Sequence, residues 1–219
     1  MKRLNDTFKH RGLRKKLVET IRAKGIKDEA VLQAINTVPR HLFLDSSFLA
    51  FAYQDQAFPI GSGQTISQPY TVAFQTELLE IKPGDTVLEV GTGSGYQACV
   101  FGEMGAKVLS IERQKRLFEK TKKFLSQFNY RIKLFYGDGY KGLPAFSPFD
   151  KIIVTAGAPF IPEELLKQLK VGGRLVIPVD IDKNLQEMTC IRKVGENEFE
   201  KRTYGQFRFV PMLGNKAND

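Results

Sequence analysis

The amino-acid sequence predicts an α/β fold, a doubly wound and mostly parallel seven-stranded sheet with helices on its faces. From residue 86 onward, short β-branched apolar runs alternate with segments of helical spacing, and repeated βαβ units build a parallel sheet. A glycine-rich turn follows the first apolar run. The last two runs, residues 185–194 and 198–210, have no helical pattern between them, so an antiparallel C-terminal edge is expected.

The residues before the sheet predict an N-terminal helical extension. Apolar residues recur at helical spacing over 7–24, 28–38 and 70–81. Asp28 suits the N-cap of the second of these helices, and Pro39 ends it. Residues 45–69 carry several glycines and prolines and predict a loop.

The elements of the sheet follow in chain order after the turn Lys82-Pro83-Gly84-Asp85. The predicted strands are residues 86–90, 107–111, 132–136, 150–155, 174–179, 185–194 and 198–210. The predicted helices between them are residues 96–104, 113–128 and 162–170. Proline suits the first helical position, where an N–H has no partner, so Pro162 is expected to begin the last helix.

The most informative stretch is the glycine-rich turn itself. Gly91, Gly93 and Gly95 follow the acidic strand end at Glu89. This layout of strand, tight turn and helix N-terminus lets backbone N–H groups approach a nucleotide-like ligand, although a purely structural turn stays open. Glu112 closes the next strand about 20 residues later, where an acidic side chain accepts hydrogen bonds from ribose hydroxyls. Dinucleotide sites place the third glycine one residue further on, so the spacing disfavours a dinucleotide oxidoreductase.

Further segments narrow the family of this chain. They are Val38–Arg40, Gly61–Tyr70 (GSGQTISQPY), Gly137–Gly142 with Ser147–Ile152, and Arg208–Met212. Together with the glycine loop, they resemble the protein-L-isoaspartate O-methyltransferase family from about residue 12 to about residue 213. The glycine spacing alone resembles the first motif of the class I methyltransferases.

The resemblance implies a Rossmann-like methyltransferase sheet in a single domain, residues 1–219. Its parts are an N-terminal helical and substrate-loop extension, about 1–81, and a cofactor-binding sheet, about 82–213. It also implies transfer of the methyl group of S-adenosylmethionine to the free α-carboxyl of L-isoaspartyl residues in damaged proteins and peptides. S-adenosylhomocysteine is then the product, and the methyl ester recyclises and reopens in part as normal aspartyl, which initiates repair.

Candidate site residues follow from the motifs. Ser67 matches the active-site serine of the family, and its hydroxyl can orient the substrate carboxylate. Glu89 is expected to organise the glycine loop and the amino group of the cofactor, and Glu112 to accept from the ribose. Asp138 is expected to accept from the adenine amino group. The expected cofactor-binding residues are Thr65, Ile66, Glu89, Gly91, Thr92, Gly93, Ser94, Gly95, Tyr96, Glu112, Asp138 and Gly139, and the expected substrate-binding residues are Ile66, Ser67, Val210 and Pro211.

The reaction implied needs neither a general base nor a metal ion. An α-carboxyl has a pKa of about 3.3–3.7, so the attacking carboxylate is already ionised at neutral pH. His10 and His41 lie outside the motifs and are expected to be structural. Cys99 and Cys190 have no paired spacing, and no His/Cys cluster has the spacing of metal ligands. Alignment of the reacting groups is then the main task, and it can supply about 7–11 kcal/mol.

The net charge of +9 keeps a nucleic-acid methyltransferase open as an alternative. The basic clusters Arg11–Lys16 and Lys115–Lys123 fall on expected helices, where a solvated face explains them more simply. The stretch Val154–Pro159 lacks the Asn/Asp-Pro-Pro-aromatic motif usual in enzymes that methylate base amino groups. A binding module for S-adenosylmethionine without catalysis is the second alternative, and the intact Ser67 and glycine loop disfavour it.

The sequence also indicates in which cell compartment the chain is expected. No apolar run approaches the roughly 20 residues of a membrane span, and Met1–Asp6 is charged with no apolar signal core behind it. We therefore expect a cytoplasmic monomer that has no membrane contact and no stable nucleic-acid partner.

Overall fold

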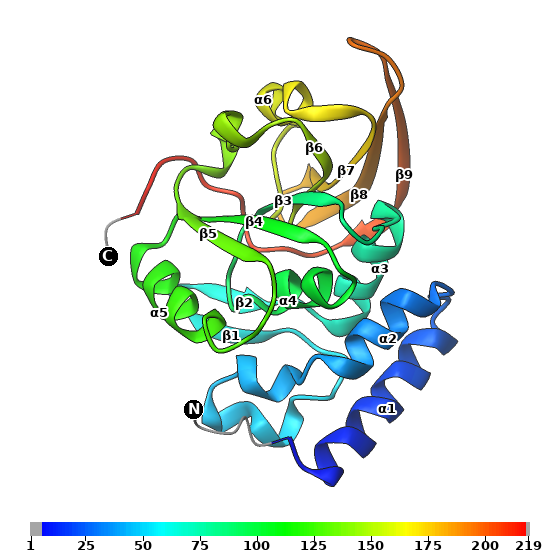
Figure 1. The fold of residues 1–219 in the computed structure, drawn as a ribbon, viewed down its shortest axis with the longest axis vertical. Coiled ribbons are helices and arrows are strands. Elements are labelled where there is room, and N and C mark those ends of the chain that lie inside the picture. Colours follow the sequence, from blue (N-terminus) through cyan, green and yellow to red (C-terminus); the bar gives the residue numbers. More distant parts are fainter. Residues whose placement is uncertain (1–5, 218–219) are drawn as a thin grey trace.

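The central sheet has seven strands in the order β5-β4-β3-β6-β7-β8-β9 (Figure 1). The computed structural model describes residues 6–217, so part of the predicted domain 1–219 and of the charged stretch Met1–Asp6 lies outside it. The strands are β3 Thr86–Val90, β4 Lys107–Glu112, β5 Ile132–Tyr136, β6 Phe149–Val154, β7 Leu169–Asp182, β8 Leu185–Lys193 and β9 Phe199–Phe207. The pairs from β5 to β7 are parallel, and β8 and β9 add antiparallel pairs. The predicted fold class is confirmed.

Two hydrophobic layers cover the two faces of the sheet. Alternate side chains of a strand point to opposite faces, so Val87 packs in one layer and Leu88 in the other. The helices are α1 Phe8–Ala23, α2 Glu29–Thr37, α3 Pro69–Leu79, α4 Tyr96–Glu103, α5 Lys115–Leu125 and α6 Glu163–Lys167. Helices α1 to α5 contribute to the layer that contains Val87, and Leu165 of α6 contributes to the other layer.

The helix boundaries agree with the sequence in the N-terminal extension and differ near the end of the sheet. Asp28 caps α2, because its Oδ1 accepts from the N–H groups of Ala30 and Val31. Pro162 is the N-cap of α6 and not its first residue, so that prediction was wrong by one position. The helix also ends early, because Leu169 already pairs with Phe149 in the sheet.

The predicted loop 45–69 contains regular structure that sequence reasoning missed. A hairpin of β1 Phe58–Gly61 and β2 Gln64–Ile66 occupies its second half, and the 3-10 helices η1 Arg40–Phe43 and η2 Ser46–Phe51 precede it. The hairpin turn needs positive φ, which is 95° at Gly61 and 65° at Gly63. A Cβ placed on Gly93 would lie 3.4 Å from Ile60, so the hairpin packs on the glycine loop.

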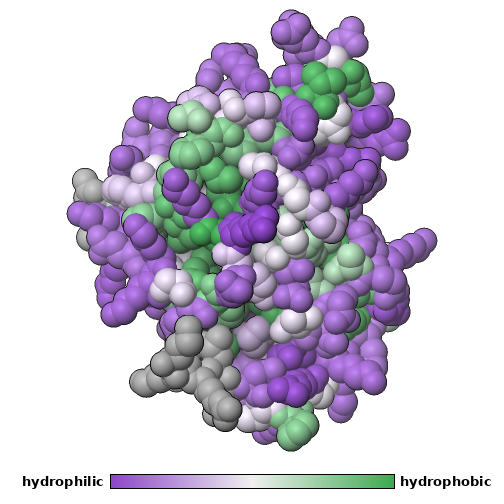
Figure 2. Space-filling model, viewed as in Figure 1, coloured by the Kyte–Doolittle hydropathy of each residue, from purple (hydrophilic) through white to green (hydrophobic). Residues whose placement is uncertain are grey.

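The face seen in Figure 2 is mostly hydrophilic, with apolar side chains exposed between hydrophilic ones near its middle. Within residues 6–217, no helix is both long enough and apolar enough to pass through a bilayer. The longest helix, α1, has 16 residues and is strongly charged.

Candidate functional site

A cleft opens at the carboxyl ends of the parallel strands. Its walls come from the loops after β3, β4, β5 and β6, from the β1–β2 hairpin and from residues 210–213. Open α/β sheets bind their ligands at this edge. The predicted site residues that line the cleft are Thr65, Ile66, Ser67, Gly91, Thr92, Gly93, Ser94, Tyr96, Glu112, Gly139, Val210 and Pro211.

The glycine loop, residues 91–95, forms one wall with a backbone that only glycine adopts easily. Its glycines have φ values of 101° at Gly91, 53° at Gly93 and 83° at Gly95. A side chain on Gly91 would also overlap Oγ1 of Thr155 in the loop after β6. Gly95 lies behind the wall, where a Cβ would come within 2.8 Å of Leu125, so this glycine serves the packing of α4 against α5.

Glu112 ends β4 and holds the glycine loop in place. Its Oε2 accepts from the N–H of Gly93 at 2.9 Å, and its Oε1 accepts from the N–H of Gln114 at 2.9 Å. Burial raises the pKa of Glu112, while these backbone donors favour its charged form. A carboxylate has about four acceptor positions, so lone pairs remain for hydroxyl groups of a ligand in the cleft.

Glu89 in β3 is fully buried behind the cleft wall. Its Oε2 accepts from Oγ of Ser110, and that Oγ lies 2.6 Å from Oγ1 of Thr92 in the glycine loop. Its Oε1 has no hydrogen-bond partner among the described residues. Burial raises the pKa of Glu89 to about 8, so the carboxyl holds its proton at neutral pH. Glu89 therefore supports the loop through two hydroxyl groups, without forming part of the wall.

Asp138 also lies beside the wall and not in it. It caps the short 3-10 helix η3 Gly139–Lys141, since Oδ1 accepts from the N–H of Tyr140 at 2.9 Å. Oδ2 accepts from the N–H of Asn215 at 2.9 Å, which ties the C-terminal segment to this corner. Gly139 does line the cleft, and a side chain there would overlap Val90, so the chain passes close to β3.

A second cavity, which we call the groove, adjoins the cleft between α3, the end of β9 and residues 205–210. It is open to solvent and has a volume of about 1030 Å³. Its aromatic lining residues are Tyr70, Phe74, Tyr204, Phe207 and Phe209, and Lys24 and Arg208 add positive charge. The cleft and the groove share Thr65, Ser67, Thr155 and Val210, so the two cavities meet at Ser67.

Sequence reasoning missed several residues of the cleft, including Gln97, Arg113 and Thr155. Oγ1 of Thr155 donates to the carbonyl oxygens of Val90 at 3.1 Å and Gly91 at 2.8 Å, which joins the ends of β6 and β3. Thr155 and Arg113 each directly follow a parallel strand. Their position at the ligand-binding edge was a usable signal in the sequence.

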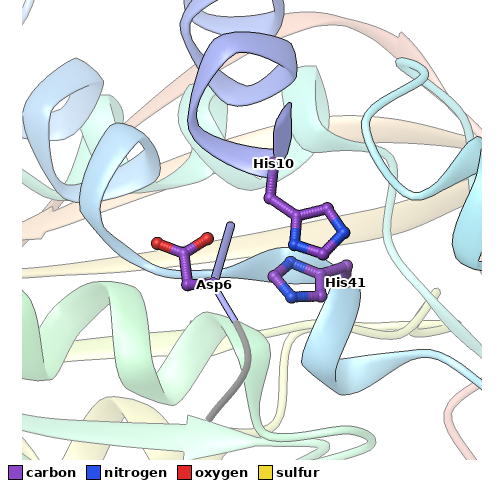
Figure 3. A group of neighbouring side chains, drawn as sticks. All are labelled: Asp6, His10 and His41. Atoms are coloured by element: carbon purple, nitrogen blue, oxygen red, sulfur yellow. The ribbon is translucent and has the colours of Figure 1, made fainter. Parts of the chain in front are cut away.

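Outside the cleft, the structure brings together three side chains of kinds that bind metal ions, which their spacing in the sequence does not indicate. Ligand atoms of Asp6, His10 and His41 lie within 4.8 Å of one another, and Figure 3 shows the two rings facing each other. Their centroids are 3.8 Å apart. However, both oxygens of Asp6 accept from Arg14 at 2.9 and 3.0 Å, and Nδ1 of His10 accepts from the N–H of Thr7 at 3.3 Å. These groups already serve protein donors, and none of the three residues lines the cleft or the groove.

The family model described as Protein-L-isoaspartate(D-aspartate) O-methyltransferase (PCMT) matches residues 12–217. The protein-L-isoaspartate O-methyltransferase of Christiangramia forsetii is 62% identical over 214 residues, which is 97% of this chain and 100% of the relative. The corresponding protein of Flavobacterium johnsoniae is 60% identical over the same shares of both chains.

Solved structures agree in fold along nearly the whole chain. A protein-L-isoaspartate O-methyltransferase structure superposes with a TM-score of 0.84 at 30% identity, over 92% of this chain and 66% of that chain. This chain therefore spans about two thirds of that longer chain. A Plasmodium falciparum structure described as a beta-aspartate methyltransferase (PCMT), in complex with S-adenosyl-L-homocysteine, gives a TM-score of 0.81 at 26% identity, over 92% and 99% of the two chains.

Proposed function

The chain belongs to the protein-L-isoaspartate O-methyltransferase family, and from this premise we propose how its own residues carry out the reaction. The enzyme uses S-adenosylmethionine to methylate the free α-carboxyl of L-isoaspartyl residues in damaged proteins and peptides. The division into a substrate-loop extension, about 1–81, and a cofactor-binding sheet, about 82–213, is part of the proposal.

The cleft has the chemistry that an adenosyl cofactor requires. Glu112 offers spare acceptor positions for the two ribose hydroxyls, and the glycine loop offers backbone beside them. Apolar side chains of Val90, Ile111 and Met212 line the same cleft and suit the flat adenine ring. We propose that Asp138 accepts a hydrogen bond from the adenine amino group of the cofactor. We also propose that Glu89, through the two hydroxyl groups described above, supports the loop that holds the methionine end of the cofactor.

The groove has the shape and lining that a peptide requires. An extended peptide held mainly through its backbone fits an enzyme that accepts many flanking sequences. Val210 lines both the groove and the cleft, as Ser67 does, and Ile66 and Pro211 line the adjoining cleft. Ser67 then donates a hydrogen bond to one oxygen of the substrate carboxylate and leaves the other oxygen to attack.

The cofactor supplies an electrophilic methyl group on a sulfonium. The carboxylate oxygen forms a bond to the methyl carbon as the carbon–sulfur bond breaks, and S-adenosylhomocysteine leaves as a neutral thioether. The protein has no proton to remove, because the substrate carboxyl is ionised at neutral pH. Its task is to align oxygen, carbon and sulfur, for which a misplacement of about 1 Å costs on the order of 100-fold in rate.

The observation that carries these assignments is the junction of the two cavities at Ser67. The test offers labelled S-adenosylmethionine with paired isoaspartyl and aspartyl peptides to wild type, Ser67→Ala and the exposed control Ser126→Ala. We expect base-labile label in the isoaspartyl peptide alone, and a turnover about 100-fold lower for Ser67→Ala with unchanged affinity for S-adenosylhomocysteine. Turnover of Ser67→Ala at the wild-type level would remove this serine from the mechanism.

We further propose that the enzyme acts as a cytoplasmic monomer without a stable nucleic-acid partner. The basic residues of α5 bear on the nucleic-acid point alone, since they form the polar face of an amphipathic helix whose buried residues are Leu117, Thr121 and Leu125. A titration with duplex DNA and with structured RNA at rising salt checks the second point. Tight binding that survives physiological salt would contradict it.

A further inference from the structure

Asp55 lies in the segment between η2 and β1 and lines neither the cleft nor the groove. Its side chain is only 8% exposed, and its carboxylate is heavily engaged. Oδ1 accepts from the N–H of Tyr70 at 2.8 Å. Oδ2 accepts from Nε2 of Gln68 at 3.0 Å and from Nζ of Lys24 at 2.5 Å. A buried carboxylate with only one of these partners would be costly, so the set acts as a unit.

These hydrogen bonds close the base of the β1–β2 hairpin. Asp55 precedes β1, whereas Gln68 and Tyr70 lie just after β2. Both ends of the hairpin therefore meet at one carboxylate. Ser67 is the residue between the end of β2 and Gln68. Tethering the ends of a segment removes conformational freedom from the residues within it. The position of Ser67 therefore depends on Asp55.

The same carboxylate completes the start of α3. Gln68 is the N-cap of this helix, but its side chain makes no capping hydrogen bond. The N–H of Tyr70, in the first turn, is one of the donors that a helix leaves unpaired. Asp55 accepts it from another part of the chain, as an N-cap side chain otherwise does. Lys24 is the C-cap residue that follows α1, and its contact ties this corner to the N-terminal extension.

We propose that Asp55 is a positioning residue for methyl transfer, which holds Ser67 at the junction of cleft and groove and thereby sets the angle at which the substrate carboxylate approaches. The inference rests on the proposed role of Ser67. Asp55 touches neither substrate nor cofactor, so its loss should change the rate of transfer and leave the affinity for the cofactor product almost unchanged.

The test begins with Asp55→Asn, which keeps the shape of the side chain and an oxygen that can accept from the N–H of Tyr70. Its amide N–H₂ faces Nζ of Lys24, so that bond is lost, and Gln68 must turn its amide oxygen toward position 55 to keep a partner there. We expect kcat on an isoaspartyl peptide to fall about 10- to 100-fold, with a smaller change in KM. We expect the Kd of S-adenosylhomocysteine to change less than about threefold, which is below 1 kcal/mol.

The control is Asp45→Asn, which breaks an exposed ion pair with Lys120 at 3.4 Å, the side chains being 54% and 63% exposed. It should retain wild-type turnover, because exposed pairs contribute little. The rescue combines Asp55→Asn with Gln68→Glu, so that the amide at position 55 donates to the carboxylate at position 68. We expect the double variant to recover most of the lost turnover. We expect Gln68→Glu alone to have a reduced turnover, because two carboxylates then face each other at positions 55 and 68.

Wild-type turnover of a folded Asp55→Asn variant would overturn the inference. So would a variant that loses turnover and S-adenosylhomocysteine binding together and is not rescued at position 68, because Asp55 would then be only a structural residue. Ser67→Ala separates the two proposals. If its turnover is unchanged, the role of Ser67 fails, and if it is impaired while Asp55→Asn is not, this inference alone fails.

Discussion

Glu112 combines two tasks in one carboxylate, since it accepts from the backbone of the glycine loop and faces the cleft. Replacing it by alanine removes the acceptors for the ribose hydroxyls and releases Gly93. Unpaired polar groups cost about 1–3 kcal/mol, so we predict that S-adenosylhomocysteine binds about 5- to 150-fold more weakly to Glu112→Ala. Calorimetry measures the Kd, and the exposed Glu119→Ala on α5 is the control. An unchanged Kd in a folded variant would exclude the role.

Glu89 makes stability depend on pH. Its carboxyl holds a proton up to about pH 8 in the folded protein, but only up to about pH 4.5 when unfolded. Between these values the folded state binds one proton more, so the free energy of unfolding falls as pH rises, by up to about 1.4 kcal/mol per pH unit. We predict that the free energy of unfolding of wild type falls in this range relative to that of Glu89→Gln. Above about pH 8, the difference between the two proteins should no longer change. Denaturant titrations at several pH values measure it, and parallel curves would contradict it.

At the scale of elements, the C-terminal segment holds one corner of the cleft. The N–H of Asn215 donates to Asp138 at 2.9 Å, and its carbonyl oxygen accepts from Nε of Arg113 at 3.0 Å, while Arg113 lines the cleft. Asn215 has a φ of 61°. Proline forbids this φ and lacks the N–H, whereas glycine keeps both.

We predict that Asn215→Pro weakens S-adenosylhomocysteine binding on the order of tenfold, as expected for a lost hydrogen bond and a displaced wall. Asn215→Gly should bind as wild type does. Calorimetry of both variants checks the prediction. Equal affinity for the proline and glycine variants would show that the segment does not shape the cleft.

The elements also show what sequence can predict. The strand Thr86–Val90 was predicted to the residue, because a β-branched run is bounded there by a turn and by the glycine loop. Residues 162–170 were read as one helix, but sheet pairing of Leu169 overrides helical spacing at its end. The hairpin in residues 58–66 was not predicted, because its strands are short and its glycines and prolines indicate only a loop.

The candidate site likewise contains some residues that the sequence predicts and others that it does not. Residues in one contiguous motif, such as the glycine loop, could be predicted from spacing, and most of them line the cleft. Thr155 could have been found from its position after a parallel strand, whereas Asp55 acts through contacts with distant segments, which no local pattern records. The same holds for His10 and His41, which tertiary packing alone brings together. Long-range contacts therefore set the limit of the sequence analysis.

At the scale of the whole molecule, the last prediction concerns metal ions and bases. The chemistry needs no group to deprotonate the substrate, and neither histidine lines the cleft or the groove. We predict that chelators leave initial methylation rates unchanged within error. We also predict that the rates do not fall tenfold per pH unit below about pH 7, the limb that a histidine base would produce.

The cluster of Asp6, His10 and His41 makes this test specific, because among the described residues its ligand atoms lie within 4.8 Å of one another, although Asp6 and His10 already accept from protein donors. His10→Ala should respond to chelators as wild type does, since Nδ1 of His10 already accepts from the N–H of Thr7. The ester is base-labile, so early label must be counted, and folding must be measured at each pH. Loss of activity on chelation in wild type, but not in His10→Ala, would establish a metal at this cluster. An acidic limb in a protein that stays folded and binds S-adenosylhomocysteine would instead indicate a base, and His41 would be the first residue to replace.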